Sequence, residues 1–438
     1  MKRRKCHIPT ASIPDLQNTE HTIPENDADT AAQKKQDQIN ASYYFRIAKH
    51  FRYLMVALIG VLAVFLVVMF STYRNEITIE NMKYFLRYID TRQAEKSATT
   101  NTIVYNETES IVRLGVYKNG LVVVGYDRVQ IYDLTGEAIL NIAQSNASPQ
   151  LAVSDASLLI YNIGGTTFQV YNSLSKEFEA SLEYPISCAA VGNSGTFLIA
   201  TRAMEYRSVV YVYNKNFEQI YRWYTPDKLV MDADFRDGDK EFMIAALGTT
   251  TEGVCYTEII LCETDKEEKK AQFRIEDEII YRVRYTSDGG YILIGGKAIY
   301  YYNAQGERIN TVSYSGYTPT TVDTNGTLSY FSVNKNIVGS NYEVTVTDQT
   351  GKVLYVGTVY GEITKALLHE NALYLLFDRS VLRISLETGN QIEKEISANC
   401  ITIQALDKNT LMLCYANETR IIDIDQFFFG EESKEATE

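Results

Sequence analysis

A phrase of alternating strand-like residues, broken by a polar turn and then resumed, recurs along most of this 438-residue chain. Clear copies are IYDLTGEAI from Ile131, YVYNKNFEQI from Tyr211, AIYYYNAQGERI from Ala298 and VTVTDQTGKVL from Val344. Its turns lie about 40 residues apart, at Gly136, Lys176, Asn216, Lys266, Gly306, Gly351 and Gly389. Repetition at this period, with β-branched and aromatic alternation, is typical of a β-propeller with four strands per blade.

The number of repeats predicts the number of blades. First strands of successive units begin near Ile111, Leu151, Ile186, Leu229, Ile279, Thr320, Ile363 and Ile401. The last unit holds only three strands, and residues 101–106 could supply the fourth from the start of the domain. We therefore expect an all-β, eight-bladed propeller, with seven blades and an odd hairpin as the alternative. In the first unit, Asn119-Gly120 predicts a tight hairpin turn.

A second feature is an apolar segment, Tyr53–Tyr73, that is long enough to span a bilayer as one helix. The chain then divides into a disordered tail, a transmembrane helix with flanks, a juxtamembrane amphipathic helix, a propeller and a C-terminal tail, at residues 1–45, 46–74, 75–97, 98–425 and 426–438. Arg46, Lys49 and Arg52 precede the apolar segment and Arg74 follows it. This excess of basic residues before the segment favours a single-pass membrane protein with a cytoplasmic N-terminus and an extracytoplasmic propeller.

Catalytic and metal-binding signatures are weak. His369 is the lone histidine of the expected propeller, so a zinc site or a Ser-His-Asp triad has little support. The stretch DADFRDGDK, from Asp232 to Lys240, could bind calcium, but a solvated hairpin turn explains it better because the downstream glutamate of a calcium loop is missing. Cys400 and Cys414 flank a predicted turn and could face each other, either bridged or as buried free thiols. We expect neither a metal nor a cofactor.

Two resemblances accompany these patterns. The turns in IYDLTGEAI and VTDQTGKVL resemble the D-x-x-G-K turn of quinoprotein-like bacterial propellers. The order of basic tail, apolar helix, ITIEN segment and repeats resembles a domain-of-unknown-function family of membrane-anchored propellers from Gram-positive bacteria. The family resemblance implies an envelope location and supplies no activity. Quinoprotein dehydrogenases carry a tryptophan after the turn in each of many blades, whereas Trp223 is the single tryptophan of this chain. We therefore expect that this protein is not an enzyme.

The favoured function is a non-catalytic binding or scaffolding module at the cell envelope, with a protein or a cell-wall polymer as partner and no nucleic acid. A transmembrane sensor is the alternative, and a quinoprotein-like or glycan-processing enzyme is the third. Tyrosine, tryptophan and arginine dominate binding hot spots, and they recur where the loops of one propeller rim are expected. The candidate partner-binding rim comprises Arg128, Tyr184, Arg207, Trp223, Tyr224, Tyr317, Tyr360 and Arg379. Capping of blade ends and closing of turns would explain the same residues.

Overall fold

The computed structural model describes residues 49–65, 67–68, 102–105, 111–173, 175–266, 268–336 and 339–430. The chain divides into two compact units, Met1–Asn81 and Met82–Glu438, which are treated separately. In the first unit, residues 49–65 and 67–68 are helical. Across the described residues, no helix combines the length and the apolar character needed to cross a membrane. The expected tail 1–45, the juxtamembrane segment 75–97 and the end of the apolar segment lie outside the described residues.

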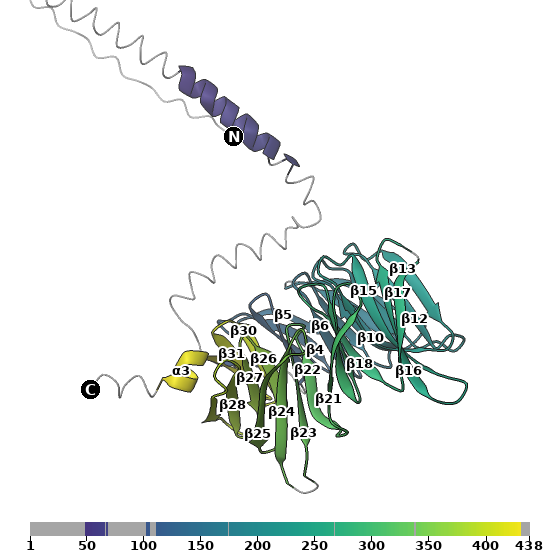
Figure 1. The fold of residues 1–438 in the computed structure, drawn as a ribbon. Helices are drawn as coiled ribbons and strands as arrows, with labels where there is room; N and C mark the ends of the chain where they lie inside the picture. The colour runs from purple at the N-terminus through teal and green to yellow at the C-terminus, as the bar shows by residue number, and fades with distance from the viewer. Residues whose placement is uncertain are drawn as a thin grey trace, which may run out of the picture. The chain divides into compact units, whose positions relative to one another are not determined.

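The described residues of the second unit form eight antiparallel sheets of four strands each (Figure 1). Blades 1 and 2 comprise β2 (Ile111–Tyr117), β3 (Gly120–Gly125), β4 (Arg128–Tyr132), β5 (Ala138–Ala143), then β6 (Pro149–Val153), β7 (Leu158–Asn162), β8 (Thr167–Tyr171) and β9 (Lys176–Ser181). Blades 3 and 4 comprise β10 (Ile186–Val191), β11 (Phe197–Thr201), β12 (Ser208–Tyr213), β13 (Gln219–Thr225), then β14 (Leu229–Phe235), β15 (Glu241–Thr249), β16 (Cys255–Glu263) and β17 (Lys269–Glu276).

The remaining blades repeat the pattern. Blades 5 and 6 comprise β18 (Ile280–Tyr285), β19 (Tyr291–Gly295), β20 (Ala298–Tyr302), β21 (Arg308–Ser313), then β22 (Pro319–Thr324), β23 (Leu328–Asn334), β24 (Asn341–Asp348) and β25 (Val353–Tyr360). Blades 7 and 8 comprise β26 (Lys365–His369), β27 (Ala372–Leu376), β28 (Ser380–Ser385), β29 (Gln391–Glu395), then β30 (Thr402–Asp407), β31 (Thr410–Cys414), β32 (Glu418–Asp423) and β1 (Thr102–Val104). First strands of neighbouring blades lie side by side, so they form the inner ring.

The eighth blade closes the ring with a strand from the beginning of the domain. β1 pairs antiparallel with β32, with Thr102 opposite Arg420 and Val104 opposite Glu418. Ile103 is fully buried in this blade, and the Tyr105 hydroxyl hydrogen-bonds the Thr419 hydroxyl. The prediction of eight blades closed by residues 101–106 is confirmed, and the seven-bladed alternative is wrong.

The repeated phrase has a simple physical origin in the turn between the third and fourth strands of a blade. The Asp133 carboxylate accepts hydrogen bonds from the backbone N–H groups of Thr135 and Glu137, at 3.0 and 2.9 Å. The side-chain oxygens at the equivalent positions do the same two and four residues ahead, from Asn214, Asn303 and Asp348. An Asp or Asn that ends a strand therefore satisfies two backbone donors and fixes the reversal.

The first hairpin differs from its prediction by one residue. The two turn residues with positive φ are Lys118 and Asn119, at 45° and 60°, whereas Gly120 begins β3. A Cβ atom at Gly120 would lie 2.9 Å from the Tyr132 carbonyl oxygen. The glycine is therefore required by close packing of the neighbouring strand, and not by the turn.

Apolar side chains on both faces of each sheet pack against the adjacent blades. One core cluster joins Leu198 and Val210 of blade 3 to Phe242 and Ile260 of blade 4, and all four side chains are fully buried. Carboxylates add inter-blade hydrogen bonds: Asp232 accepts from the Val283 N–H at 2.9 Å, and Asp239 accepts from the Thr196 N–H at 3.0 Å. The DADFRDGDK stretch thus forms the expected hairpin turn, exposed at Asp237 and Gly238, and two of its carboxylates also join blade 4 to both neighbours.

The propeller unit ends in a short helix, α3 (Ile424–Phe429). Asp423 caps it by accepting a hydrogen bond from the Gln426 N–H at 2.8 Å. Phe428 is buried, and its ring centroid lies 5.8 Å from that of Tyr374 in blade 7. The expected tail from residue 426 is therefore wrong for residues 426–429, because burial of this phenylalanine holds the segment against the last blades. Residues 431–438 lie outside the described residues.

Candidate functional site

The eight residues of the predicted rim are distributed around the ring from blade 1 to blade 7. Arg128 begins β4 and pairs with Asp127 at 2.8 Å, and Arg379 lies 3.6 Å from Asp378 in the turn between β27 and β28. Arg207 directly precedes β12. These arginines are at the loops between second and third strands, as predicted, and two of them form ion pairs within their own turns.

Trp223 and Tyr224 lie within the outer strand β13, and not in the loop that follows it. Side chains alternate along a strand, so the two rings project from opposite faces of blade 3. Trp223 packs against the core cluster between blades 3 and 4, and the Lys269 ammonium lies 5.4 Å from its ring centroid. Tyr224 is 41% exposed and contacts the Tyr206 ring at a centroid distance of 4.9 Å. Trp223 therefore helps to dock two blades, and Tyr224 is the exposed member.

The other tyrosines of the rim occupy the connections between blades. Tyr184 lies between β9 and β10, Tyr317 lies between β21 and β22, and Tyr360 is the last residue of β25. Tyr317 is 40% exposed and Tyr360 is 73% exposed. The eight residues of the predicted rim are thus spread over several blades and are not gathered at one point, and their role in binding stays a prediction.

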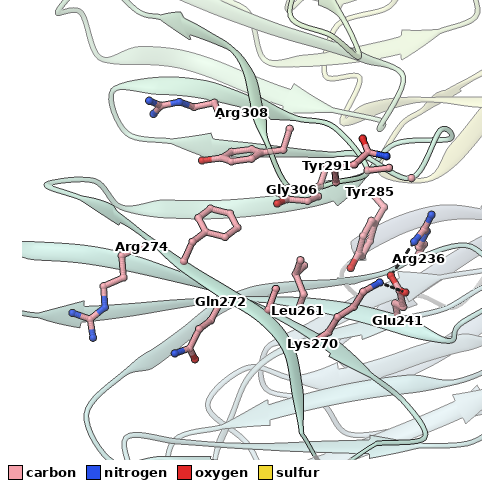
Figure 2. Close-up of a pocket in the computed structure, with 16 residues that line it drawn as sticks. Arg236, Glu241, Leu261, Lys270, Gln272, Arg274, Tyr285, Tyr291, Gly306 and Arg308 are labelled. Atoms are coloured by element: carbon pink, nitrogen blue, oxygen red, sulfur yellow. Dashed lines mark hydrogen bonds and ion pairs between the residues drawn. The ribbon is translucent and has the colours of Figure 1, made fainter.

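A cavity of about 640 Å³ lies on the other side, between blades 4 and 5 (Figure 2). It is bordered by the first hairpins of both blades, at Arg236 and Gly289, and by the last hairpin of blade 5, at Gly306. Its other lining residues come from the strands, and include Glu241, Leu261, Lys270, Gln272, Phe273, Arg274, Tyr285, Tyr291, Tyr302 and Arg308. The predicted rim contains none of them.

Three aromatic rings form one wall of this cavity. The Tyr302 ring centroid lies 4.9 Å from that of Tyr291 and 5.0 Å from that of Phe273. Tyr291 begins β19 and Tyr302 ends β20, so the two are direct cross-strand partners, whereas Phe273 comes from the outer strand of blade 4. Pairing fixes the two tyrosines, and blade stacking brings the phenylalanine to them.

Two phenol groups at the cavity lack hydrogen-bond partners. The hydroxyl oxygens of Tyr285 and Tyr291 are buried, and neither has a partner within the described part of the chain. Burial raises the pKa of both hydroxyls above the usual range, so both stay protonated and can donate. Buried polar groups are normally paired. Within the described residues, these two buried hydroxyls beside the cavity therefore have unused hydrogen-bonding capacity.

Cationic side chains outnumber the acidic one at the cavity. Glu241 lies between Arg236, at 3.0 Å, and Lys270, as the dashed lines in Figure 2 show. Burial opposes ionisation of this carboxyl, but the hydrogen bonds from Lys270 and Arg236 outweigh that effect and lower its pKa. Arg274 donates a hydrogen bond to Glu258, at 3.3 Å, and Arg308 is a fourth cationic residue of the lining. The arrangement suits a ligand that accepts hydrogen bonds or carries negative charge.

The described residues offer no cluster of three or more His, Cys, Asp or Glu side chains that could hold a metal ion. The His369 ring nitrogen lies 3.3 Å from the Lys408 carbonyl oxygen. Cys400 and Cys414 are buried free thiols, with the Cys400 sulfur 3.5 Å from the Cys414 carbonyl oxygen. Of the two possibilities for this pair, the structure has the unbridged one.

Comparison with protein families assigns the propeller region. The model described as "Family of unknown function (DUF5711)" matches residues 90–424. The chain belongs to the DUF5711 family. None of the curated proteins matches this DUF5711 chain. The resemblance to a domain-of-unknown-function family, inferred from the order of the segments, is thus supported for the propeller, and the membrane segment remains a prediction.

Solved structures similar to the DUF5711 propeller show its fold alone, because sequence identity is low. BamB from Moraxella catarrhalis has a TM-score of 0.53 at 9% identity, covering 74% of this chain and 99% of that chain. The C-terminal WD40 domain of Sif2 has a TM-score of 0.53 at 12% identity, covering 74% and 98%. Dihydro-heme d1 dehydrogenase NirN has a TM-score of 0.50 at 12% identity, covering 76% and 82%.

Proposed function

We propose that this DUF5711 chain is a non-catalytic binding module whose propeller recruits a partner through the cavity between blades 4 and 5. The observation that carries the proposal is the pair of unpartnered hydroxyls, Tyr285 and Tyr291, in a cavity with a cationic border. Such a cavity fits an acidic or carbonyl-rich segment of the partner, which would accept hydrogen bonds from the phenols and offset the positive charge.

The proposal places the module at the cell envelope. The apolar segment Tyr53–Tyr73 would anchor it as a single-pass helix, with the N-terminus in the cytoplasm and the propeller outside. The partner would then be an envelope protein, with a cell-wall polymer as the alternative. The support is the absence of charged residues from the segment and the basic margin of Arg46, Lys49 and Arg52 before it.

The non-catalytic part of the proposal is supported by the chemistry of the cavity. Its one carboxylate, Glu241, is held in ion pairs by two cations, so it is poorly placed to act as a general base. Cofactor absorbance of the purified full chain tests this part directly. A stoichiometric quinone or haem spectrum would contradict it.

Crosslinking in living cells tests the binding function. We expect the full chain to capture one discrete partner, and we expect Arg308→Glu to reduce the yield about tenfold, because the new charge would repel an acidic segment at the cavity. Lys176→Glu is the matched control. Lys176 opens the outer strand of blade 2, as Arg308 opens that of blade 5, and each pairs with the last tyrosine of the preceding strand.

Comparison of the two variants should distinguish binding at this cavity from binding elsewhere on the surface. Equal loss in both variants, or capture that is unchanged by Arg308→Glu and by Tyr291→Phe, would overturn the assignment of binding to this cavity. Capture of no partner by the folded chain would overturn the binding function itself.

A further inference from the structure

The outer strand of blade 6, β25, presents an uncharged sheet edge. Among the described strands it pairs with β24 alone. Of the outer strands in blades 1–7, β5 and β25 are the two that contain no Asp, Glu, Lys or Arg, and β25 has eight residues where β5 has six. Native sheets usually protect an exposed edge with charge, proline or a very short strand. β25 has a bulge near its start, but from Tyr355 to Tyr360 it pairs regularly with β24 and contains neither a charged residue nor a proline.

A bulge near the start of the outer strand lets the blades be aligned residue by residue. In blade 6, Val346 pairs with Tyr355 and Thr347 with Val353, so Leu354 is the bulged residue and Val356 follows two positions later. The same pairing pattern recurs in blades 1–5, and blade 7 aligns through its strand pairs. The residues equivalent to Val356 are all polar, namely Asn141, Glu179, Arg222, Gln272, Thr311 and Glu393.

The exception at Val356 is part of an exposed apolar stripe. Val356 is 55% exposed, Leu354 is 37% exposed and Tyr360 is 73% exposed, and the three alternate along one face of β25. On the opposite face, Tyr355 and Val359 pack against blade 7. The stripe is therefore not needed for blade packing, and solvent would favour polar residues there, as the other blades show.

We propose that β25 pairs antiparallel with β25 of a second copy of this chain. Formal net charge is −13, so most surfaces of two copies repel each other, whereas this edge is uncharged and bordered by apolar side chains on both copies. The pairing would join two four-stranded blades into one eight-stranded sheet across a two-fold axis, with the same patch on both partners.

Geometry limits the register. If the two-fold axis is normal to the sheet, a residue of one copy and the residue that faces it in the other copy lie on the same face of the joined sheet. Because side chains alternate between faces along a strand, the sequence numbers of these two residues must differ by an even number. With the stripe centred, Val356 faces its own copy and Leu354 faces the partner's Thr358. Opposed Cβ atoms in such a pair lie about 4.5–5.5 Å apart, which is close enough for engineered cysteines to bridge after a small adjustment.

Disulfide trapping of the full chain in the cells that express it tests the proposal. Under mild oxidation, Val356→Cys should form covalent dimers about tenfold more than Thr311→Cys, which occupies the equivalent exposed position in blade 5 and measures random collision. Leu354→Cys and Thr358→Cys should crosslink efficiently when they are co-expressed and poorly when each is alone. The unmodified chain gives the background from native cysteines.

A second variant checks that the dimer exists without a covalent bond. Val356→Lys should lower the dimer fraction in sedimentation equilibrium of the detergent-solubilised chain about tenfold, and Thr311→Lys should leave it unchanged. A wild-type monomer, equal trapping at Val356 and Thr311, or trapping of Val356→Cys to a different protein would overturn the proposal. The last of these results would assign the edge to a foreign strand.

Discussion

At the scale of single residues, Asp133 shows how the repeated phrase produces the fold. Its buried carboxylate accepts hydrogen bonds from two backbone N–H groups and from the Thr135 hydroxyl, at 2.6 Å for the last. Asparagine occupies the same place in blades 3 and 5, at Asn214 and Asn303, with the same backbone partners two and four residues ahead. What the turn requires is an oxygen on a short side chain, and not a charge.

Replacing Asp133 tests this requirement. Asp133→Ala leaves two backbone donors without their acceptor, so we expect the free energy of unfolding to fall by about 1–2 kcal/mol. Asp133→Asn keeps the acceptor and should stay within about 0.5 kcal/mol of the wild type. Chemical denaturation followed by tryptophan fluorescence measures both. Equal losses in the two variants would show that the charge, and not the acceptor geometry, stabilises the turn.

At the scale of elements, most strands could be predicted because the signals that define them are local. Alternation and the Asp or Asn turn lie within one repeat, and the recurrence of this repeat, with only three strands in its last copy, predicted eight blades and a closing strand from residues 101–106. The cavity could not be predicted in the same way. Phe273 and Tyr302 belong to different blades and meet only after the blades stack. The expected position of Trp223 in a rim loop failed for a different reason: Pro226 indicates a turn nearby, but β13 continues to Thr225.

The closing strand β1 gives a prediction at this scale. Ile103 is fully buried, so Ile103→Ala should remove packing from blade 8 and lower the free energy of unfolding by about 2–4 kcal/mol. Its neighbour Val104 is 52% exposed, and Val104→Ala should change stability by less than about 0.5 kcal/mol. Hydrogen exchange should show the Ile103→Ala loss first in β32, the strand that β1 pairs with. Uniform exchange across all blades would contradict a local role for this closure.

At the scale of the whole molecule, both membrane insertion of the segment Tyr53–Tyr73 and its orientation remain predictions. A cysteine reagent that cannot cross membranes should label Met204→Cys on intact cells and should miss Thr30→Cys, if the propeller is outside and the tail inside. Met204 suits this purpose because its side chain is 100% exposed, whereas Asn146 on the same domain is buried. The opposite labelling pattern would reverse the orientation. Labelling of both sites in intact, sealed cells would argue against a single spanning segment.

The way in which the ring closes has a mechanical consequence. Any tension carried along the chain from before residue 102 enters the propeller at β1, which is joined to β32 by three paired residues, Thr102 to Val104. A pull on this tether would load that short ladder before any other blade, because the remaining strands continue directly from one blade to the next. The seam of the ring would thus be the first part of the propeller to carry such a load. If it gave way, blade 8 would lose its outer strand while seven blades kept all four of theirs.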